Sequence, residues 1–228
     1  MKNNNSTYCI PIIKQTQKDV IKTINKNKKY YDFFEIWIDY IIDIDIKFIE
    51  KLKEKLSNKL SILFRRQNLE PSKLDWEMRK KILHILNESN VLVDFDLFSQ
   101  NNELNYVKKQ NLKVRKILSY HNYKETPSKK ILESIIKKME RYSPEIYKIS
   151  TFCNKDIDAI VLLETLTILK EKNKKYIVLG MGEKGIIVRI YGVLKGNVMN
   201  FAPKTLKDKS APGQLTIKQL KTIIHAIN

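Results

Sequence analysis

The sequence predicts a single-domain (β/α)8 barrel, also called a TIM barrel, over residues 1–228. Short apolar runs with the length of buried strands alternate with amphipathic helical segments, and short connections join them. Several of these runs end abruptly on polar side chains. Barrel enzymes carry their active sites at the C-terminal ends of the strands, so these ends are the expected site. A doubly wound open sheet shows the same alternation and is the structural alternative.

Eight strands are expected from runs rich in apolar, β-branched and aromatic residues. They cover residues 8–13, 33–39, 60–65, 91–97, 117–121, 146–151, 176–181 and 198–202. The end of the second strand is weakly defined, because the IDID that follows could extend it.

Helices are expected over residues 15–25, 45–56, 72–86, 102–109, 126–139, 155–170 and 216–227, and none is assigned between 181 and 198. Asp45 and Ser72 are expected to cap the second and third of these helices. Pro127 lies in the first turn of the fifth, where its fixed φ is favourable.

The composition is that of a globular domain, with 43% hydrophobic and 30% charged residues. No apolar run approaches the roughly 20 residues that cross a bilayer. The N-terminal stretch MKNNNSTYCIPII is interpreted as the first strand and not as a signal peptide. Cys9 and Cys153 are far apart, which favours a reducing cytoplasm over a disulfide framework. We therefore expect a cytoplasmic protein that does not associate with membranes.

The formal net charge is +18, from 43 basic and 25 acidic residues. Such a charge attracts phosphates and acidic ligands. Only six of the basic residues are arginines, however, and nucleic-acid readers depend on arginine for bidentate contacts. The lysines are scattered along helix faces. A solvated lysine surface without a nucleic-acid partner is the favoured interpretation.

Lys148 and His121 are the strongest candidates for chemistry, since each lies near the end of a strand and the two strands are consecutive. Side chains alternate inward and outward along a barrel strand, so Lys148 can face the interior. Burial there is expected to lower its pKa and free the amine as a nucleophile. The alternatives are a strand-end lysine that reaches solvent and a structural histidine.

Three further groups have polar side chains in apolar or turn-rich surroundings. Arg189 lies among Ile187, Val188 and Ile190, so it needs an anionic partner, either a ligand carboxylate or a structural acid. The polar loop over residues 207–214 follows the last strand, where barrel enzymes often have a mobile loop that covers the active site. Glu35 and Asp39 share a strand face, with Arg65 available as a partner.

Several ordered stretches resemble one family, the type I 3-dehydroquinate dehydratases. They are SYHNYKETP (119–127), IYKIS (146–150), MGEKGIIVRI (181–190) and SAPGQL (210–215), with weaker matches at FEIWID and ILFR. The resemblance implies a lyase of the shikimate pathway, on the route to chorismate and the aromatic amino acids. It would convert 3-dehydroquinate to 3-dehydroshikimate through a lysine Schiff base.

The resemblance also implies the roles of individual residues. Lys148 would form the imine, and His121 would act as general base and then as general acid. Substrate contacts would come from Glu35, Arg65, Met181, Arg189, Ser210 and Gln214. The family needs no metal or other cofactor and is commonly a homodimer. The cysteines and histidines also lack the spacing of a metal site.

The chain departs from the family pattern at three positions near the expected site. One is Val188, which replaces a small hydroxyl residue before Arg189. Trp37 stands where the family has an arginine, and Leu69 stands where it has a glutamate that supports the catalytic histidine, with Glu70 one residue late. These changes leave two alternatives open. One is another Schiff-base barrel lyase acting on a related keto acid, and the other is a non-catalytic barrel that binds a ligand or nucleic acid.

Overall fold

The computed structural model describes residues 6–227, in which eight strands and eight α-helices alternate. Residues 1–5, part of the stretch for which no signal peptide is expected, and residue 228 lie outside the described range. The strands lie in the order β7-β6-β5-β4-β3-β2-β1-β8. All seven neighbouring pairs are parallel. The Val198 amide donates to the Tyr176 carbonyl at 3.0 Å and brings the two edges of the sheet together.

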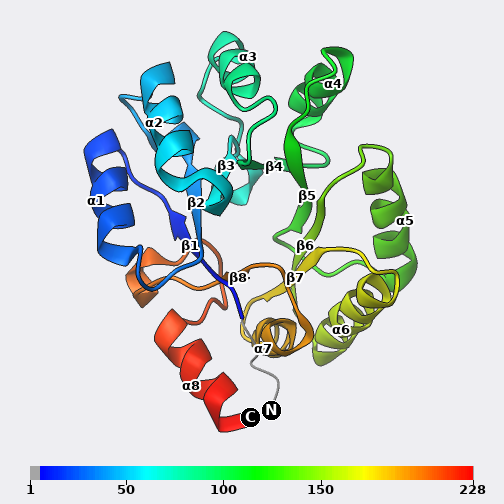
Figure 1. Ribbon diagram of the computed structural model, residues 1–228. Coiled ribbons are helices and arrows are strands. Elements are labelled where there is room, and N and C mark those ends of the chain that lie inside the picture. The colour runs from blue at the N-terminus through cyan, green and yellow to red at the C-terminus, as the bar shows by residue number, and fades with distance from the viewer. Residues whose placement is uncertain (1–5, 228) are drawn as a thin grey trace.

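The strands and helices follow one another in strict alternation. The strands are β1 Tyr8–Ile12, β2 Phe33–Trp37, β3 Leu60–Leu63, β4 Leu92–Asp96, β5 Arg115–Asn122, β6 Ile146–Phe152, β7 Tyr176–Met181 and β8 Asn200–Phe201. The helices are α1 Gln17–Asn27, α2 Ile46–Leu56, α3 Trp76–Ile85, α4 Asn101–Lys109, α5 Lys129–Glu140, α6 Asp156–Glu171, α7 Ile186–Lys195 and α8 Ile217–Ile227. They surround the strands as one outer ring (Figure 1).

The predicted (β/α)8 fold class is confirmed, and the doubly wound alternative is wrong. Strands that are consecutive in sequence are neighbours in the sheet, β8 returns to β1, and the helices cover the outer face of the sheet (Figure 1). A doubly wound sheet would instead reverse its strand order and carry helices on both faces.

Three local predictions need correction. The helix α7 was not expected, because GIIVRIYGVLK is apolar almost throughout and shows no polar stripe; its left-handed C-cap at Gly196 ends it. Ser72 does not cap α3. Asp75 does, accepting from the Met78 amide at 2.7 Å, while Ser72 bonds Asp39. The second strand ends at Trp37, where the 3-10 turn Ile38–Tyr40 begins.

The barrel interior has an apolar layer at one end and a polar layer at the other. The apolar layer consists of Cys9, Leu92, Ile117, Ile146, Ile177, Leu179, Met199 and Phe201. Several of these lie at the beginnings of their strands, so they close the N-terminal end of the barrel. The larger cluster between sheet and helices holds the ring of helices in place. Polar side chains are therefore left for the C-terminal end.

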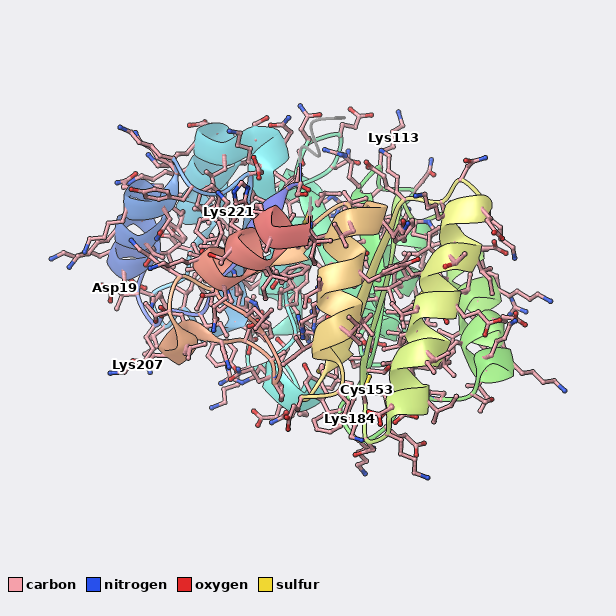
Figure 2. The ribbon with its side chains drawn as sticks, turned by 90° about the horizontal axis from the view of Figure 1, so that it is seen from below. Asp19, Lys113, Cys153, Lys184, Lys207 and Lys221 are labelled. Atoms are coloured by element: carbon pink, nitrogen blue, oxygen red, sulfur yellow. The ribbon has the colours of Figure 1, made fainter. Side chains whose placement is uncertain are left out.

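Both ends of the barrel can be followed in Figure 2. Cys153, which directly follows β6, and Lys113, which precedes β5, lie at opposite ends of the molecule. Lys113, Lys184 and Lys207 extend outward from the surface (Figure 2). Among the described helices, none has the length and apolar character that spanning a membrane requires. Cys9 and Cys153 are both buried and unpaired.

Candidate active site

Lys148 lies inside the barrel, in the middle of β6, and is only 3% exposed. Its Nζ lies 2.7 Å from Asp94 Oδ2 on β4 and 3.1 Å from Glu35 Oε1 on β2. The ring of Phe201 on β8 lies beneath the amine, 4.2 Å from it. The structure thus favours the inward orientation over a strand-end lysine that reaches solvent.

The predicted lowering of the Lys148 pKa is wrong for this arrangement. Burial does lower the pKa, as desolvation of the ammonium requires. The charges of Asp94 and Glu35 outweigh burial, however, and the pKa lies above its ordinary value. The sequence could not show this, because the two acids come from strands distant from Lys148 along the chain.

His121 lies at the end of β5, next to β6. Ser119 is paired in register with Lys148, and His121 with Ser150, so the histidine and lysine face the same cavity one layer apart. The imidazole is buried and uses both nitrogens. Nδ1 lies 3.0 Å from Asp96 Oδ2, and Nε2 lies 3.3 Å from Arg65 Nη2.

These contacts determine which nitrogen of His121 carries the proton. A guanidinium can only donate, so Nε2 must accept with its lone pair. Nδ1 then carries the hydrogen, and the Asp96 carboxylate accepts it. Burial and the charge of Arg65 lower the pKa of His121 and outweigh Asp96, which raises it. The histidine is therefore held neutral, with its basic nitrogen Nε2 against Arg65 at the wall of the cavity.

Arg65 follows β3 and links the histidine to the lysine. Its Nη1 lies 3.0 Å from Asp94 Oδ1, and the other oxygen of Asp94 binds Lys148. Ser119 donates a further hydrogen bond to Asp94 at 2.6 Å. Burial raises the pKa of the Asp94 carboxyl, but the charges of Arg65 and Lys148 outweigh it and keep the pKa well below its usual range. Asp94 is thus the ionised centre of the network.

Arg189 lies on α7 and is 3% exposed. Its Nη2 donates to the Pro212 carbonyl at 3.3 Å, while Nε and Nη1 are buried without a hydrogen-bond partner among residues 6–227. No carboxylate within that range forms an ion pair with it. Burial lowers its pKa to about 10. Of the two partners left open by the sequence, the described residues offer no structural acid, which favours a ligand anion.

The closing loop, residues 207–214, covers the same cavity. Gln214 Oε1 accepts from the Ser210 amide at 2.8 Å, and Gln214 Nε2 donates to Ser210 Oγ at 2.9 Å. Gly213 has φ +75° and lies against Gly182, so the loop is fastened to the turn after β7. Ser210 and Gln214 both line the cavity.

The departures from the family pattern at Trp37 and Leu69 have different surroundings. Trp37 lines the cavity, donates from Nε1 to Glu35 Oε2 at 2.9 Å, and has Arg65 5.5 Å above its ring. Leu69 is half-buried with φ +59°. Glu70 is exposed and lies 3.6 Å from Arg66, so it supports that arginine and not His121.

The cavity itself is tight. Its volume is about 30 Å³, and it is lined by Glu35, Trp37, Arg65, His121, Tyr123, Lys148, Ser150, Leu179, Arg189, Phe201, Ser210, Ala211 and Gln214. Of the predicted site residues, Met181 is absent from this lining; it is buried at the end of β7. Ligand pockets usually have volumes of about 300–1,000 Å³, so a ring-sized ligand requires this cavity to widen.

Sequence reasoning missed several residues that the structure brings to the site. Asp94 and Asp96 hold the lysine and the histidine, and Tyr123 stacks on His121 with ring centres 6.2 Å apart. Two acids in alternate positions of an apolar strand, VLVDFDL, were the available signal, since both must face the interior together. Within residues 6–227, no group of His, Cys, Asp or Glu side chains has an arrangement that could hold a metal ion.

The fold and this site define a class of protein, a (β/α)8 barrel enzyme whose amine and carboxylate groups lie inside the barrel, beneath an imidazole near the C-terminal end of β5. The sequence model of one family, type I 3-dehydroquinase, matches residues 8–228. The chain belongs to the type I 3-dehydroquinase family, and its activity is that of a 3-dehydroquinate dehydratase, a lyase.

Relatives and solved structures agree with this family. The 3-dehydroquinate dehydratase of Methanococcus maripaludis strain C6 is 31% identical over 222 residues, which cover 96% of this chain and 99% of the relative. The structure of the type I 3-dehydroquinate dehydratase from Clostridium difficile with covalently modified comenic acid is 26% identical, with a TM-score of 0.78, and covers 97% of this chain and 92% of that one. The Geobacillus kaustophilus enzyme, 22% identical, shares the fold with a TM-score of 0.82 over 98% of this chain and 91% of its own.

Proposed function

We propose that the enzyme eliminates water from 3-dehydroquinate through an imine on Lys148, with His121 as the proton carrier. One observation carries this proposal: a buried lysine amine and the basic nitrogen of a neutral histidine face one cavity from adjacent strands. An imine with a lysine turns a ketone into an electron sink, so a base as weak as imidazole can remove the neighbouring proton.

The two carboxylates beside Lys148 act at two stages of the reaction, on the ammonium before it attacks the ketone and on the protonated imine that forms afterwards. The ammonium must lose a proton before the amine attacks the ketone, and Asp94 Oδ2 and Glu35 Oε1 are acceptors within hydrogen-bond distance. Attack and loss of water then give a protonated imine, which is again positive. The same carboxylates stabilise this cation, whose positive charge makes the adjacent carbon acidic.

His121 takes part in two successive transfers of the same proton. Nε2 first removes a proton from the carbon next to the imine and leaves an enamine. The resulting imidazolium then gives this proton to the hydroxyl on the following carbon, which departs as water while the double bond forms. Hydrolysis of the imine consumes one water, releases 3-dehydroshikimate and returns the free Lys148. The balance is one water lost per substrate.

The remaining predicted residues are assigned to substrate binding. We assign the substrate carboxylate to Arg189, whose buried Nε and Nη1 lack partners among the described residues. Ser210 and Gln214 contact the substrate from the closing loop, and Glu35 and Arg65 hold its hydroxyls; all four line the cavity. Met181 is assigned to the wall of the widened pocket, and no metal or other cofactor takes part.

Borohydride trapping tests this proposal. The protein is incubated with 3-dehydroquinate, reduced, and mapped by mass spectrometry, while enone absorbance reports product before reduction. An adduct on Lys148 together with the enone supports the mechanism, and Lys148→Ala should lose both. Lys116→Ala is the matched control, because Lys116 is a strand lysine of lowered pKa that lines a separate pocket. Full turnover in Lys148→Ala would contradict the proposal.

We also infer that the enzyme is a homodimer. Three exposed isoleucines support this: Ile157 and Ile160 on α6 are 56% and 57% exposed, and Ile187 on α7 is 50% exposed. The two helices are neighbours (Figure 2), and apolar side chains gathered on neighbouring helices favour association. Light scattering should give twice the monomer mass, and Ile160→Lys should reduce it. A monomeric wild-type protein at micromolar concentration would contradict the inference.

The cytoplasm is the proposed location, supported by two buried, unpaired cysteines that suit a reducing compartment. The excess of lysine is proposed to be a solvated surface with no nucleic-acid partner. A titration of the protein with duplex DNA at several salt concentrations tests the second point. Tight binding that falls steeply with salt would contradict it.

A further inference from the structure

Asp96 holds its carboxylate in one orientation by using its two oxygens for different partners. The side chain lies at the end of β4 and is 1% exposed. Oδ1 accepts the backbone amides of Phe98 at 3.1 Å and Ser99 at 2.9 Å, and also the Ser99 hydroxyl at 2.9 Å. Oδ2 is left for His121 Nδ1 at 3.0 Å. Backbone donors therefore fix the carboxylate from the side opposite the histidine.

The position that carries a supporting glutamate in the resembled family holds Leu69 here, which has no hydrogen-bonding group. Glu70 is turned outward to Arg66. Among the described residues, the carboxylate that contacts the imidazole is Asp96. In this chain the carboxylate that supports His121 therefore comes from the end of β4 and not from the loop after β3.

We propose that Asp96 is the positioning residue of His121: it fixes the Nδ1–H tautomer and so keeps Nε2 unprotonated, as the base of the reaction. This inference rests on the proposed role of His121 as the proton carrier. Arg65 contributes from the opposite side, because its donor faces Nε2 and favours the same tautomer. Only this tautomer can remove a proton through Nε2.

The hydrogen bonds of Asp96 make Asp96→Asn a sharp test. An asparagine must turn its oxygen toward the Phe98 and Ser99 amides, since its amino group cannot accept from them. The amino group then faces His121 Nδ1 and can only donate. Nδ1 must accept, the imidazole proton moves to Nε2, and the base is lost. An Asp→Asn change of this kind in the Ser-His-Asp triad lowers kcat by about 10⁴-fold through the wrong tautomer.

Kinetics and trapping separate this role from a structural one. We expect Asp96→Asn to lower kcat by roughly 10²-fold or more with a much smaller change in KM, and still to give the borohydride adduct on Lys148. In a His121→Ala background the same change should cost little, because Asp96 acts through the histidine. An equal loss in both backgrounds, or a kcat within a few-fold of wild type, would overturn the inference.

Two further measurements keep the test valid if Asp96→Asn folds poorly. Asp96→Glu keeps a carboxylate and should retain more of kcat than Asp96→Asn. Nitrogen-15 NMR of the wild-type protein should show His121 with a protonated Nδ1 and an unprotonated Nε2; the opposite tautomer would overturn the inference without any variant. Asp45→Asn, a change of the same type at the N-cap of α2, should leave kcat unchanged. Full turnover by His121→Ala would instead overturn the proposed role of His121.

Discussion

Arg189 on α7 donates from Nη2 to the carbonyl of Pro212 in the closing loop, at 3.3 Å. The same guanidinium has two buried nitrogens without partners among residues 6–227. A buried charge in this state is costly unless a ligand completes it. The contact therefore couples anion binding by Arg189 to the position of the closing loop. Substitutions at Arg189 and in the loop test these two roles separately.

Replacing Arg189 with methionine should weaken substrate binding without unfolding the protein. Hydrogen bonds to charged groups are worth about 1.5–3 kcal/mol, so KM should rise roughly 10- to 100-fold. Removal of an incompletely paired buried charge often stabilises a protein, so the melting temperature should stay the same or rise. Steady-state kinetics and thermal melting measure both. An unchanged KM with a lower melting temperature would show that Arg189 is structural.

Gly213→Ala should displace the closing loop. An added Cβ would come within 2.3 Å of the Gly182 carbonyl oxygen, and φ +75° is strained for any L side chain. We expect kcat/KM to fall by about tenfold or more, since Ser210, Gln214 and the Pro212 contact to Arg189 move together.

Gly196→Ala is the matched control for this change. Its φ of +97° carries the same kind of backbone strain, about 1–2 kcal/mol, but its Cβ would meet nothing closer than the Tyr176 hydroxyl at 3.9 Å. In urea denaturation Gly196→Ala should lose stability from the backbone strain alone and keep its activity, whereas Gly213→Ala, which adds the clash with Gly182, should also lose activity. Equal activity in the two variants would exclude a role for the loop.

Trp37→Phe should separate the two contacts of the indole. The ring beneath Arg65 is kept, while the donor to Glu35 is lost. A net hydrogen bond is worth about 1 kcal/mol, so kcat/KM for 3-dehydroquinate should fall roughly fivefold.

Trp37→Arg introduces the residue of the resembled family and should improve turnover of 3-dehydroquinate. If Trp37→Arg instead abolishes it, the indole serves a substrate preference of this chain.

Acid should weaken the protein partly through Glu145. Its carboxylate accepts two hydrogen bonds from Arg115, at 2.8 and 2.9 Å, and one from Lys175 at 3.0 Å. The Arg115 bond in particular lowers its pKa to about 2. A folded pKa below the unfolded value of about 4.3 means that the contribution is complete above pH 4.3 and is lost as the pH falls toward 2.

Urea denaturation of wild type and Glu145→Gln between pH 7 and pH 2 measures this contribution. The free energies of unfolding should differ at neutral pH and converge near pH 2. Glu140→Gln, whose partner Lys174 lies 3.5 Å away on the surface, serves as the control and should remain close to wild type. A constant gap between Glu145→Gln and wild type across the whole range would contradict the assignment.

The sequence by itself determined the barrel, the order of its strands and the two side chains most suited to chemistry. Strand-length apolar runs report burial directly, and a residue at the end of a strand in a barrel can face only a few neighbours. His121 and Lys148 could therefore be placed side by side before any coordinates. The family resemblance rests on such local stretches as well.

Only the tertiary structure decided what surrounds these side chains. The positive pKa shift of Lys148 arises from Asp94 and Glu35, and the tautomer of His121 from Asp96 and Arg65. These partners come from different strands, and a change of an ångström in their separation alters the electrostatic balance. Local sequence records which groups are buried, whereas their mutual distances and orientations depend on how the whole barrel closes.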